Sequence, residues 1–151
     1  MITPAQKVLI VSYYWPPSGG SGVQRWMYFA KYLKELGWEP IVITVKQQQA
    51  SYAVWDESLT EEVSHIRVIR TDTSEPLKWY SFLITGSLQK GIPQGEVKRK
   101  SLFQKLAAYI RGNYFLPDAR KGWVPFAVKA VQKVLKKEPI SHLITTGPPH
   151  S

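Results

Sequence analysis

The sequence contains no cysteine, and it has only three histidines among 151 residues. Without cysteine the chain can form neither disulfides nor thiolate metal sites. The three histidines, His65, His142 and His150, lack the spacing of metal ligands, and we interpret His65 and His142 as structural residues at strand edges. No acidic D-x-D pair supplies another set of ligands. The sequence therefore predicts no metal site.

Long apolar runs are also absent, and none approaches the length of a membrane span. The amino terminus, Met-Ile-Thr-Pro-Ala-Gln, has no charged region followed by a long apolar core, so it does not look like an export signal. These two absences predict a cytoplasmic protein. A hydrophobic content of 44% in a chain of this length is typical of one folded domain with a substantial core.

Negative charge is scarce, with 11 Asp and Glu against 20 Lys and Arg, which gives a net charge of +9. Such a surface attracts polyanions, including nucleic acid, acidic lipid headgroups and phosphorylated ligands. The excess of positive charge lies mostly after residue 89, while the first half of the chain is nearly balanced. Net charge alone does not choose among these partners, because it also serves ordinary solubility.

Residues 7–36 carry the clearest pattern in the chain, KVLIVSYYWPPSGGSGVQRWMYFAKYLKEL. The apolar, β-branched run at 7–12 is typical of a strand that is buried on both faces of a parallel sheet. Two prolines end the strand, and the loop at 18–22 that follows has almost no side chains. Residues 23–36 then predict an amphipathic helix.

The predicted helix has a capping signal at each end. Ser21 is the predicted N-cap, and Gln24 three residues later completes a capping box. Gly37 stands where a C′ glycine would end the helix. The first turn of such a helix leaves N–H groups unpaired, and a loop without Cβ atoms lets an anion reach them, so phosphate is the natural ligand. The alternative is a tight connection in which the glycines only relieve crowding.

The dinucleotide-binding fingerprint does not fit this loop. The pattern G-x-G-x-x-G beginning at Gly20 would require a third glycine where the chain has Arg25. The acidic residue expected after the second strand is replaced by Lys46. We therefore expect no NAD site here.

The remaining pattern alternates strands and helices. Further strands are predicted at 40–45, 65–70 and 142–146, and further helices at 56–62, 102–110 and 123–137. Six apolar residues of the last helix are expected to point inward: Val124, Ala127, Val128, Val131, Val134 and Leu135. A mobile loop is predicted at 86–97 from its glycines and proline.

This order of elements predicts an α/β fold, with a mainly parallel sheet and helices on both faces. Ligands of such sheets bind beyond the carboxyl ends of the strands. The loops at 15–22 and 147–151 both leave such ends, so we expect them to share one rim, with Ser12 and Thr146 close together.

The predicted helix at 102–110 has an apolar stripe surrounded by five basic residues: Lys98, Arg99, Lys100, Lys105 and Arg111. Basic amphipathic helices of this kind can lie on anionic membranes, so we expect a peripheral contact with the inner face of the membrane or with an acceptor. The alternative is a domain helix whose basic face is solvated.

Three segments, taken in order, resemble one enzyme family. The segment KVLIVSYYWPPSGGSGVQRWMYFAKYLKELGWEPIVIT and the later phrases PDARKGWVPFA and ITTGPPHS are similar to sequences of the family 4 retaining glycosyltransferases. The resemblance covers most of 7–46 and 113–151, while 47–112 is not diagnostic.

The resemblance implies an enzyme with two Rossmann-like domains that face each other across a cleft, the GT-B arrangement. Residues 1–151 would be the truncated amino-terminal, acceptor-side domain, without the carboxyl-terminal donor domain and its paired glutamates. The full-length protein would move a hexosyl-type sugar from a nucleotide-sugar to a saccharide or lipid-linked acceptor in cell-envelope or polysaccharide synthesis, with retention and without a cofactor. This chain alone would not transfer sugar.

The resemblance also implies roles for particular residues. The glycine loop of the family approaches the donor diphosphate, a role that corresponds here to Gly19, Gly20 and Gly22. Arg25 would add positive charge on the first helical turn. His150 corresponds to a histidine that contacts the donor sugar, so it is the candidate catalytic residue.

Two other classes of function stay open at this level. A non-enzymatic basic module could bind anionic membrane or nucleic acid through the charge of +9 and the aromatic residues. The basic residues are spread over several elements and no nucleic-acid motif is present, so we expect no nucleic-acid partner. A different phosphate-binding Rossmann protein is disfavoured by Arg25 and Lys46.

Overall fold

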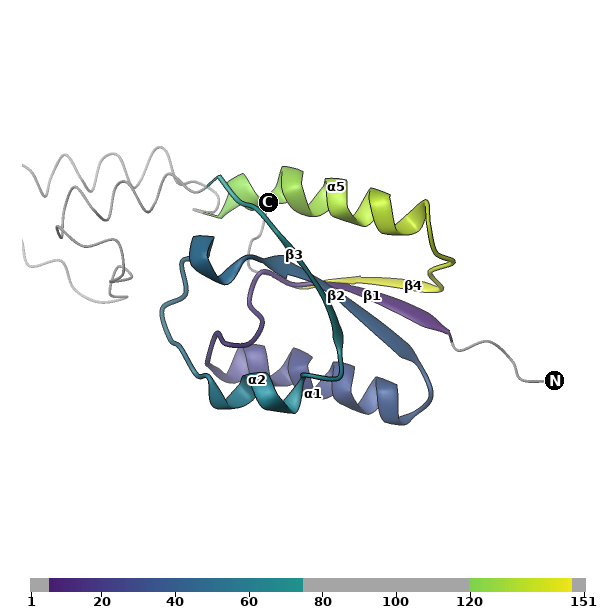
Figure 1. Ribbon diagram of the computed structural model, residues 1–151, viewed down its shortest axis with the longest axis horizontal. Helices are drawn as coiled ribbons and strands as arrows, with labels where there is room; N and C mark the ends of the chain where they lie inside the picture. Colours follow the sequence, from purple (N-terminus) through teal and green to yellow (C-terminus); the bar gives the residue numbers. More distant parts are fainter. Residues whose placement is uncertain (1–5, 75–119, 148–151) are drawn as a thin grey trace, which may run out of the picture.

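The computed structural model describes residues 6–74 and 120–147, and these form a parallel sheet between two layers of helix (Figure 1). The sheet has the order β3-β2-β1-β4 and consists of β1 (Lys7–Val11), β2 (Glu39–Val45), β3 (Arg67–Thr71) and β4 (His142–Thr145). Every neighbouring pair of these strands is parallel. The predicted parallel α/β fold is confirmed, and the strand order is compatible with a Rossmann-like half.

Helices cover both faces of the sheet, as the sequence predicts (Figure 1). Two helices, α1 (Ser21–Glu35) and α2 (Ser58–Glu62), lie on one face, and α5 (Val124–Leu135) lies on the other. Two short 3-10 turns, η1 (Gln47–Gln49) and η2 (Lys121–Trp123), follow β2 and precede α5. The predicted helix at 102–110 and the predicted loop at 86–97 lie outside the described residues.

The two central strands explain why the core has two halves. Successive side chains of a strand point to opposite faces, so β1 sends Val8 and Ile10 to one face and Leu9 to the other. The first half of the core packs against α1 and α2, and the second packs against α5. Since β2 is buried along almost its whole length, its continuous apolar sequence fits a strand covered on both sides.

Helix α1 packs on the sheet through Val23, Met27 and Ala30. It ends as predicted at Gly37, which has a φ of 84°. The Gly37 N–H donates to the Lys34 carbonyl at 3.0 Å, and the Trp38 N–H donates to the Leu33 carbonyl at 2.9 Å. This pair of bonds is a Schellman motif, which requires the left-handed conformation that glycine adopts without strain.

Two of the inward residues predicted for α5 point outward instead. Ala127 and Val134 are buried, but Val128 is 48% exposed and Leu135 is 47% exposed. The reason is that α5 packs over β2 and β3, so its side toward β4, an edge strand of the described sheet, is left uncovered. An apolar groove of about 260 Å³ remains between α5 and β4, and its lining includes Val128 and Leu143.

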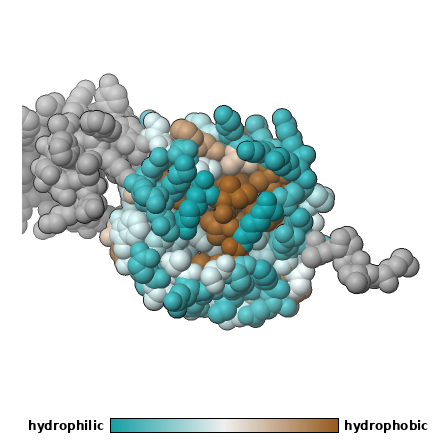
Figure 2. Space-filling model, in the orientation of Figure 1, coloured by the Kyte–Doolittle hydropathy of each residue, from teal (hydrophilic) through white to brown (hydrophobic). Residues whose placement is uncertain are grey.

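The other edge of the sheet is also incompletely covered. The side chains of β3 are only partly buried. Figure 2 shows that apolar side chains gather at the centre of the visible face, between α5 and α2, with polar side chains around them.

The prediction that His65 lies in the third strand is wrong, because β3 begins at Arg67 and the Ile66 N–H donates to the Val63 carbonyl in the preceding turn. His142 does lie in the edge strand β4.

Two searches of the described residues concern metals and membranes. No group of three or more His, Asp or Glu side chains within 6–74 and 120–147 is placed to hold a metal ion. None of the helices in those ranges has both the length and the apolar character that crossing a bilayer requires.

Candidate functional site

The order of the strands reverses at β1, and a crevice lies between the ends of β1 and β4. From β1 the chain runs outward to β2 and β3, while β4 lies on the opposite side of β1. In open α/β sheets, ligands bind at such a switch point, beyond the carboxyl ends of the strands. Ser12 follows β1 and Thr146 follows β4, so these two residues mark the floor of the crevice.

The predicted closeness of Ser12 and Thr146 is confirmed. The Thr146 N–H donates to the Val11 carbonyl at 3.1 Å, which extends the ladder between β1 and β4 by one bond. The Thr146 hydroxyl donates to Ser12 Oγ at 3.0 Å, and the buried Ser12 hydroxyl donates to the Tyr14 carbonyl at 2.9 Å. These bonds fix the floor of the crevice and satisfy its hydroxyl groups.

The crevice has a volume of about 150 Å³. Its walls come from the end of β1, the first turn of α1 and the end of β4. The lining residues are Ser12, Tyr14, Gly22, Val23, Arg25, Trp26, Thr146 and Gly147. The loops that leave β1 and β4 therefore do meet at one rim, at least as far as Gly147.

Ser21 is not the N-cap of α1, contrary to the capping-box prediction. Helix α1 already begins at Ser21, and Gly20 occupies the N-cap position with a φ of 107° and a ψ of 158°. The Gly20 carbonyl accepts the N–H groups of Val23 and Gln24 at 3.1 and 3.2 Å. Because the cap is a glycine, no side chain turns back to bond the first turn.

The missing cap leaves two backbone donors unpaired at the start of α1, and one of them, at Gly22, belongs to a residue that lines the crevice. Within the described residues, the N–H groups of Ser21 and Gly22 have no hydrogen-bond partner. The first turn of α1 contains no acidic residue, and the exposed Arg25 side chain makes no ion pair with any described residue. An anion in the crevice would meet the N–H of Gly22, with that of Ser21 next to it in the chain, the positive end of the helix dipole and the Arg25 side chain.

The three loop glycines have different structural roles. The Gly19 N–H donates to the Val54 carbonyl at 3.0 Å, so it is not available to a ligand. A Cβ on Gly19 would lie 2.8 Å from Val54 Cγ1, which means that this glycine permits a close approach between two loops. Gly20 supplies a backbone conformation that other residues rarely adopt. A Cβ on Gly22 would meet nothing within 4 Å, so this is the glycine that keeps the crevice open.

The other predicted site residues are not placed by the structure. His150 lies outside the described residues, three positions beyond Gly147 in the crevice wall. The five basic residues proposed for membrane or acceptor contact also lie outside them: Lys98, Arg99, Lys100, Lys105 and Arg111.

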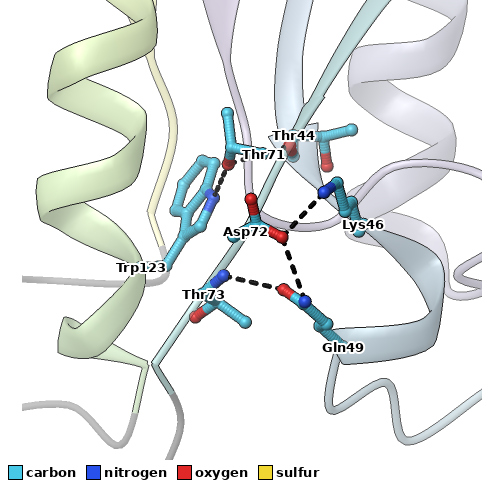
Figure 3. Close-up of polar contacts among 7 residues, drawn as sticks. All are labelled: Thr44, Lys46, Gln49, Thr71, Asp72, Thr73 and Trp123. Atoms are coloured by element: carbon cyan, nitrogen blue, oxygen red, sulfur yellow. Dashed lines mark hydrogen bonds and ion pairs between the residues drawn. The ribbon is translucent and has the colours of Figure 1, made fainter.

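A second polar cluster, which the sequence did not single out, lies at the carboxyl ends of β2 and β3 (Figure 3). The Lys46 ammonium lies 2.7 Å from Asp72 Oδ1, and the Gln49 amide donates to the same oxygen at 3.0 Å. The Thr73 N–H donates to Gln49 Oε1 at 3.0 Å. The hydrogen bond from Lys46 is the main cause that lowers the pKa of the Asp72 carboxyl below its usual value.

Trp123 joins this cluster to α5. Its indole N–H donates to the Thr71 hydroxyl at 2.7 Å, and that hydroxyl donates in turn to the Thr44 carbonyl at 3.3 Å (Figure 3). Trp123 is buried, so its N–H needs this acceptor. The cluster could have been suspected from the rule that neighbouring parallel strands bring their carboxyl ends together, since Lys46 and Asp72 each follow a strand.

An aromatic cluster supports the loop between the two sites. The Arg120 guanidinium lies 5.5 Å from the Tyr13 ring centre and 5.1 Å from that of Tyr14. Arg70 donates to the Pro16 carbonyl at 2.9 Å, and burial lowers the pKa of its guanidinium group below the usual value. Both arginines hold the segment after β1 in place, and neither role has a local signal in the sequence.

Comparison of the chain with protein-family models, with curated proteins and with solved structures gives no match.

Proposed function

We propose that this chain is the acceptor-side domain of a nucleotide-sugar glycosyltransferase, and that its crevice receives the donor diphosphate. The observation that carries the proposal is the unpartnered N–H of Gly22 beside Arg25 in the crevice lining, preceded by the unpartnered N–H of Ser21, within the part of the chain that the structure describes. The resemblance of 7–46 and 113–151 to family 4 glycosyltransferases supports the same ligand, because a nucleotide-sugar presents an anionic diphosphate.

The chemistry of sugar transfer gives these donors a purpose. When the bond between the anomeric carbon and the diphosphate breaks, negative charge develops on the departing oxygen. N–H groups that are already fixed stabilise this charge without reorganising during the reaction. In this chain they are fixed because α1 is packed on the sheet through Val23 and Met27. The sugar would pass to a hydroxyl group of a saccharide or lipid-linked acceptor.

The proposal is tested by titrating the ¹⁵N-labelled chain with UDP, GDP and inorganic pyrophosphate. We expect the amide signals of Ser21 and Gly22 to shift with at least one of them. Gly22→Ala should weaken that binding about ten- to a hundredfold, because a methyl group would stand where the anion approaches and a lost charge-assisted bond costs about 1.5–3 kcal/mol. Since this Cβ would touch no protein atom, the fold should be unaffected.

Two further variants serve as controls for the titration. Gln24→Ala changes an exposed residue of the same helix that does not line the crevice, so binding should stay as in the wild type. Arg25→Gln should weaken binding less than Gly22→Ala and should reduce its salt dependence, because it removes a charge and keeps the aligned N–H groups. Unchanged affinity in Gly22→Ala, or no shift with any of the three anions, would show that the loop is only a tight connection.

A further inference from the structure

Trp55 is a large aromatic side chain that lies exposed at the same rim, on the loop between η1 and α2. It is 49% exposed, although the chain buries Trp15 and Trp123 almost completely. Its backbone is held on both sides. Trp55 forms an antiparallel bridge with Ser18, the Gly19 N–H donates to Val54, and the Asp56 N–H donates to the Pro17 carbonyl at 2.7 Å. The loop at 54–56 is thus fixed to the glycine loop.

The indole ring is also supported from behind. Its centre lies 5.3 Å from the ring of the buried Tyr52, at an interplanar angle of 62°. The Tyr52 ring lies 5.9 Å from that of Tyr14, which lines the crevice, and the Tyr52 hydroxyl donates to the Tyr13 carbonyl at 3.2 Å. A row of aromatic rings therefore runs from the crevice to Trp55, and its outermost member is partly open to solvent.

The charge around Trp55 indicates what kind of ligand this surface accepts. Residues 47–66 contain four carboxylates and no Lys or Arg, in a chain whose net charge is +9. Glu62 is paired with Lys31, whereas Asp56 and Glu57, directly after Trp55, make no ion pair with a described residue. Asp56 follows Trp55 directly, and its Oδ1 accepts both the N–H and the hydroxyl of Ser58. Within the described residues its Oδ2 has no partner, so this oxygen can accept a hydrogen bond from a hydroxyl group. Such a surface repels phosphates and nucleotides and favours a neutral ligand rich in hydroxyl groups.

We propose that Trp55, supported by Tyr52 and flanked by Asp56, is the stacking surface for a neutral pyranose ring of the acceptor saccharide. The apolar C–H face of the sugar would lie on the indole, and a ring hydroxyl would donate to Asp56 Oδ2. This inference depends on the proposed function, and it adds the chemical class of the acceptor and its position. The anionic donor and the neutral acceptor would then occupy two oppositely charged parts of one rim.

The experiment follows the indole N–H signals of the six tryptophans in the ¹⁵N-labelled chain during titration with methyl glycosides of glucose, galactose and mannose. We expect at least one glycoside, at millimolar concentration, to shift the Trp55 indole signal and not that of the partly buried Trp38, whose ring packs edge-to-face against His142. Trp55→Ala should weaken the binding about tenfold, whereas Trp55→Phe should keep most of it, because aromatic contacts contribute up to about that factor. Asp56→Asn should weaken it less than Trp55→Ala does.

The outcomes separate this inference from the proposed function. The inference is overturned if no glycoside shifts Trp55, if Trp55→Ala binds as the wild type does, or if UDP shifts Trp55 as strongly as the glycosides do. UDP shifts at Gly22 without glycoside shifts at Trp55 would overturn the inference alone. Glycoside shifts at Trp55 without any anion at Gly22 would support the saccharide surface and remove the proposed donor site. Trp55 is half exposed, so its replacement should not unfold the chain. A melting temperature of Trp55→Ala near that of the wild type would show that the variant is folded.

Discussion

The two ends of the carboxyl rim differ in how completely their polar groups are paired. At the ends of β2 and β3, the Lys46 charge is neutralised by Asp72, and Gln49 bonds both Asp72 and Thr73. At the ends of β1 and β4, Arg25 has no ion pair and two helix N–H groups have no acceptor, as far as the described residues extend. Both ends carry one basic side chain at a strand end or helix start, so the presence of a basic residue does not by itself distinguish them.

This difference indicates which end of the carboxyl rim is available to a ligand. A buried or half-buried polar group that has already found its partners stabilises the fold and gains little from a further contact. A donor that the fold leaves unpaired gains from a ligand, because no internal bond must break first. We therefore propose the β1/β4 crevice as the anion site and interpret the β2/β3 cluster as a structural clamp between the sheet and α5.

Glycine substitutions should show this difference most strongly. A Cβ on Gly122, next to the clamp, would lie 1.8 Å from the Ser74 carbonyl oxygen, so the backbone would have to move. We expect Gly122→Ala to cost about 3 kcal/mol and to lower Tm by about 10 °C. The matched change in the crevice, Gly22→Ala, should leave Tm unchanged or slightly higher, since alanine favours helix and nothing lies within 4 Å. Thermal melting measures both, and equal losses would contradict the comparison.

Removing the acceptor of Trp123 should have the next largest effect. Thr71→Val keeps the shape of the side chain but leaves the buried indole N–H without its bond of 2.7 Å. An unsatisfied buried donor costs about 1–3 kcal/mol, and we expect a loss in that range in urea unfolding. Thr71→Ser keeps the hydroxyl and should lose much less. If both variants unfold at the same urea concentration, the clamp does not depend on this bond.

The smallest expected effect is the response of the Lys46–Asp72 pair to pH. The pKa of Asp72 is lower in the folded chain than its usual value, so this pair stabilises the fold at pH values above the usual aspartate pKa. Its contribution is lost as the pH falls below that value and through the lowered pKa of the folded state. Both side chains are nearly half exposed, so the effect should be small and should weaken with salt.

The pH experiment is an NMR titration of the Asp72 carboxyl group. Lys46→Met removes the first cause of the lowered pKa, so the Asp72 pKa should rise toward its usual value. Arg25→Gln in the crevice should leave the Asp72 pKa as it is, because Arg25 does not contact this pair. An Asp72 pKa that does not respond to Lys46→Met would remove the argument that the clamp is paired in solution.

Much of the fold followed from local patterns. The strand, glycine loop and helix at 7–36, the C′ glycine at Gly37 and the meeting of Ser12 with Thr146 were all predicted and are confirmed. Periodicity and turn chemistry are local properties, so a single sequence can reveal them. The parallel arrangement also followed, because strands that alternate with helices must run in one direction.

The wrong predictions share one cause, which is that they required knowledge of neighbours. Ser21 has the right side chain for an N-cap, but the conformation of Gly20 starts the helix at Ser21 and leaves the first turn uncapped. Val128 and Leu135 fit the apolar period of α5, but α5 packs over β2 and β3 in a way that leaves both side chains about half exposed. A helical pattern shows which residues can be buried, and the sheet decides which of them are.

For the candidate site, the sequence predicted that a glycine loop precedes a helix, but it placed Arg25 on the first turn, whereas α1 begins at Ser21 and Arg25 is its fifth residue. Which groups remain available there depends on the tertiary structure. It bonds Gly19 to Val54, pairs Lys46 with Asp72 and supports Trp55 on Tyr52, each joining segments that lie on separate parts of the chain. Whether a polar or aromatic group is already satisfied depends on such distant partners, and their meeting depends on the complete path of the chain through the sheet.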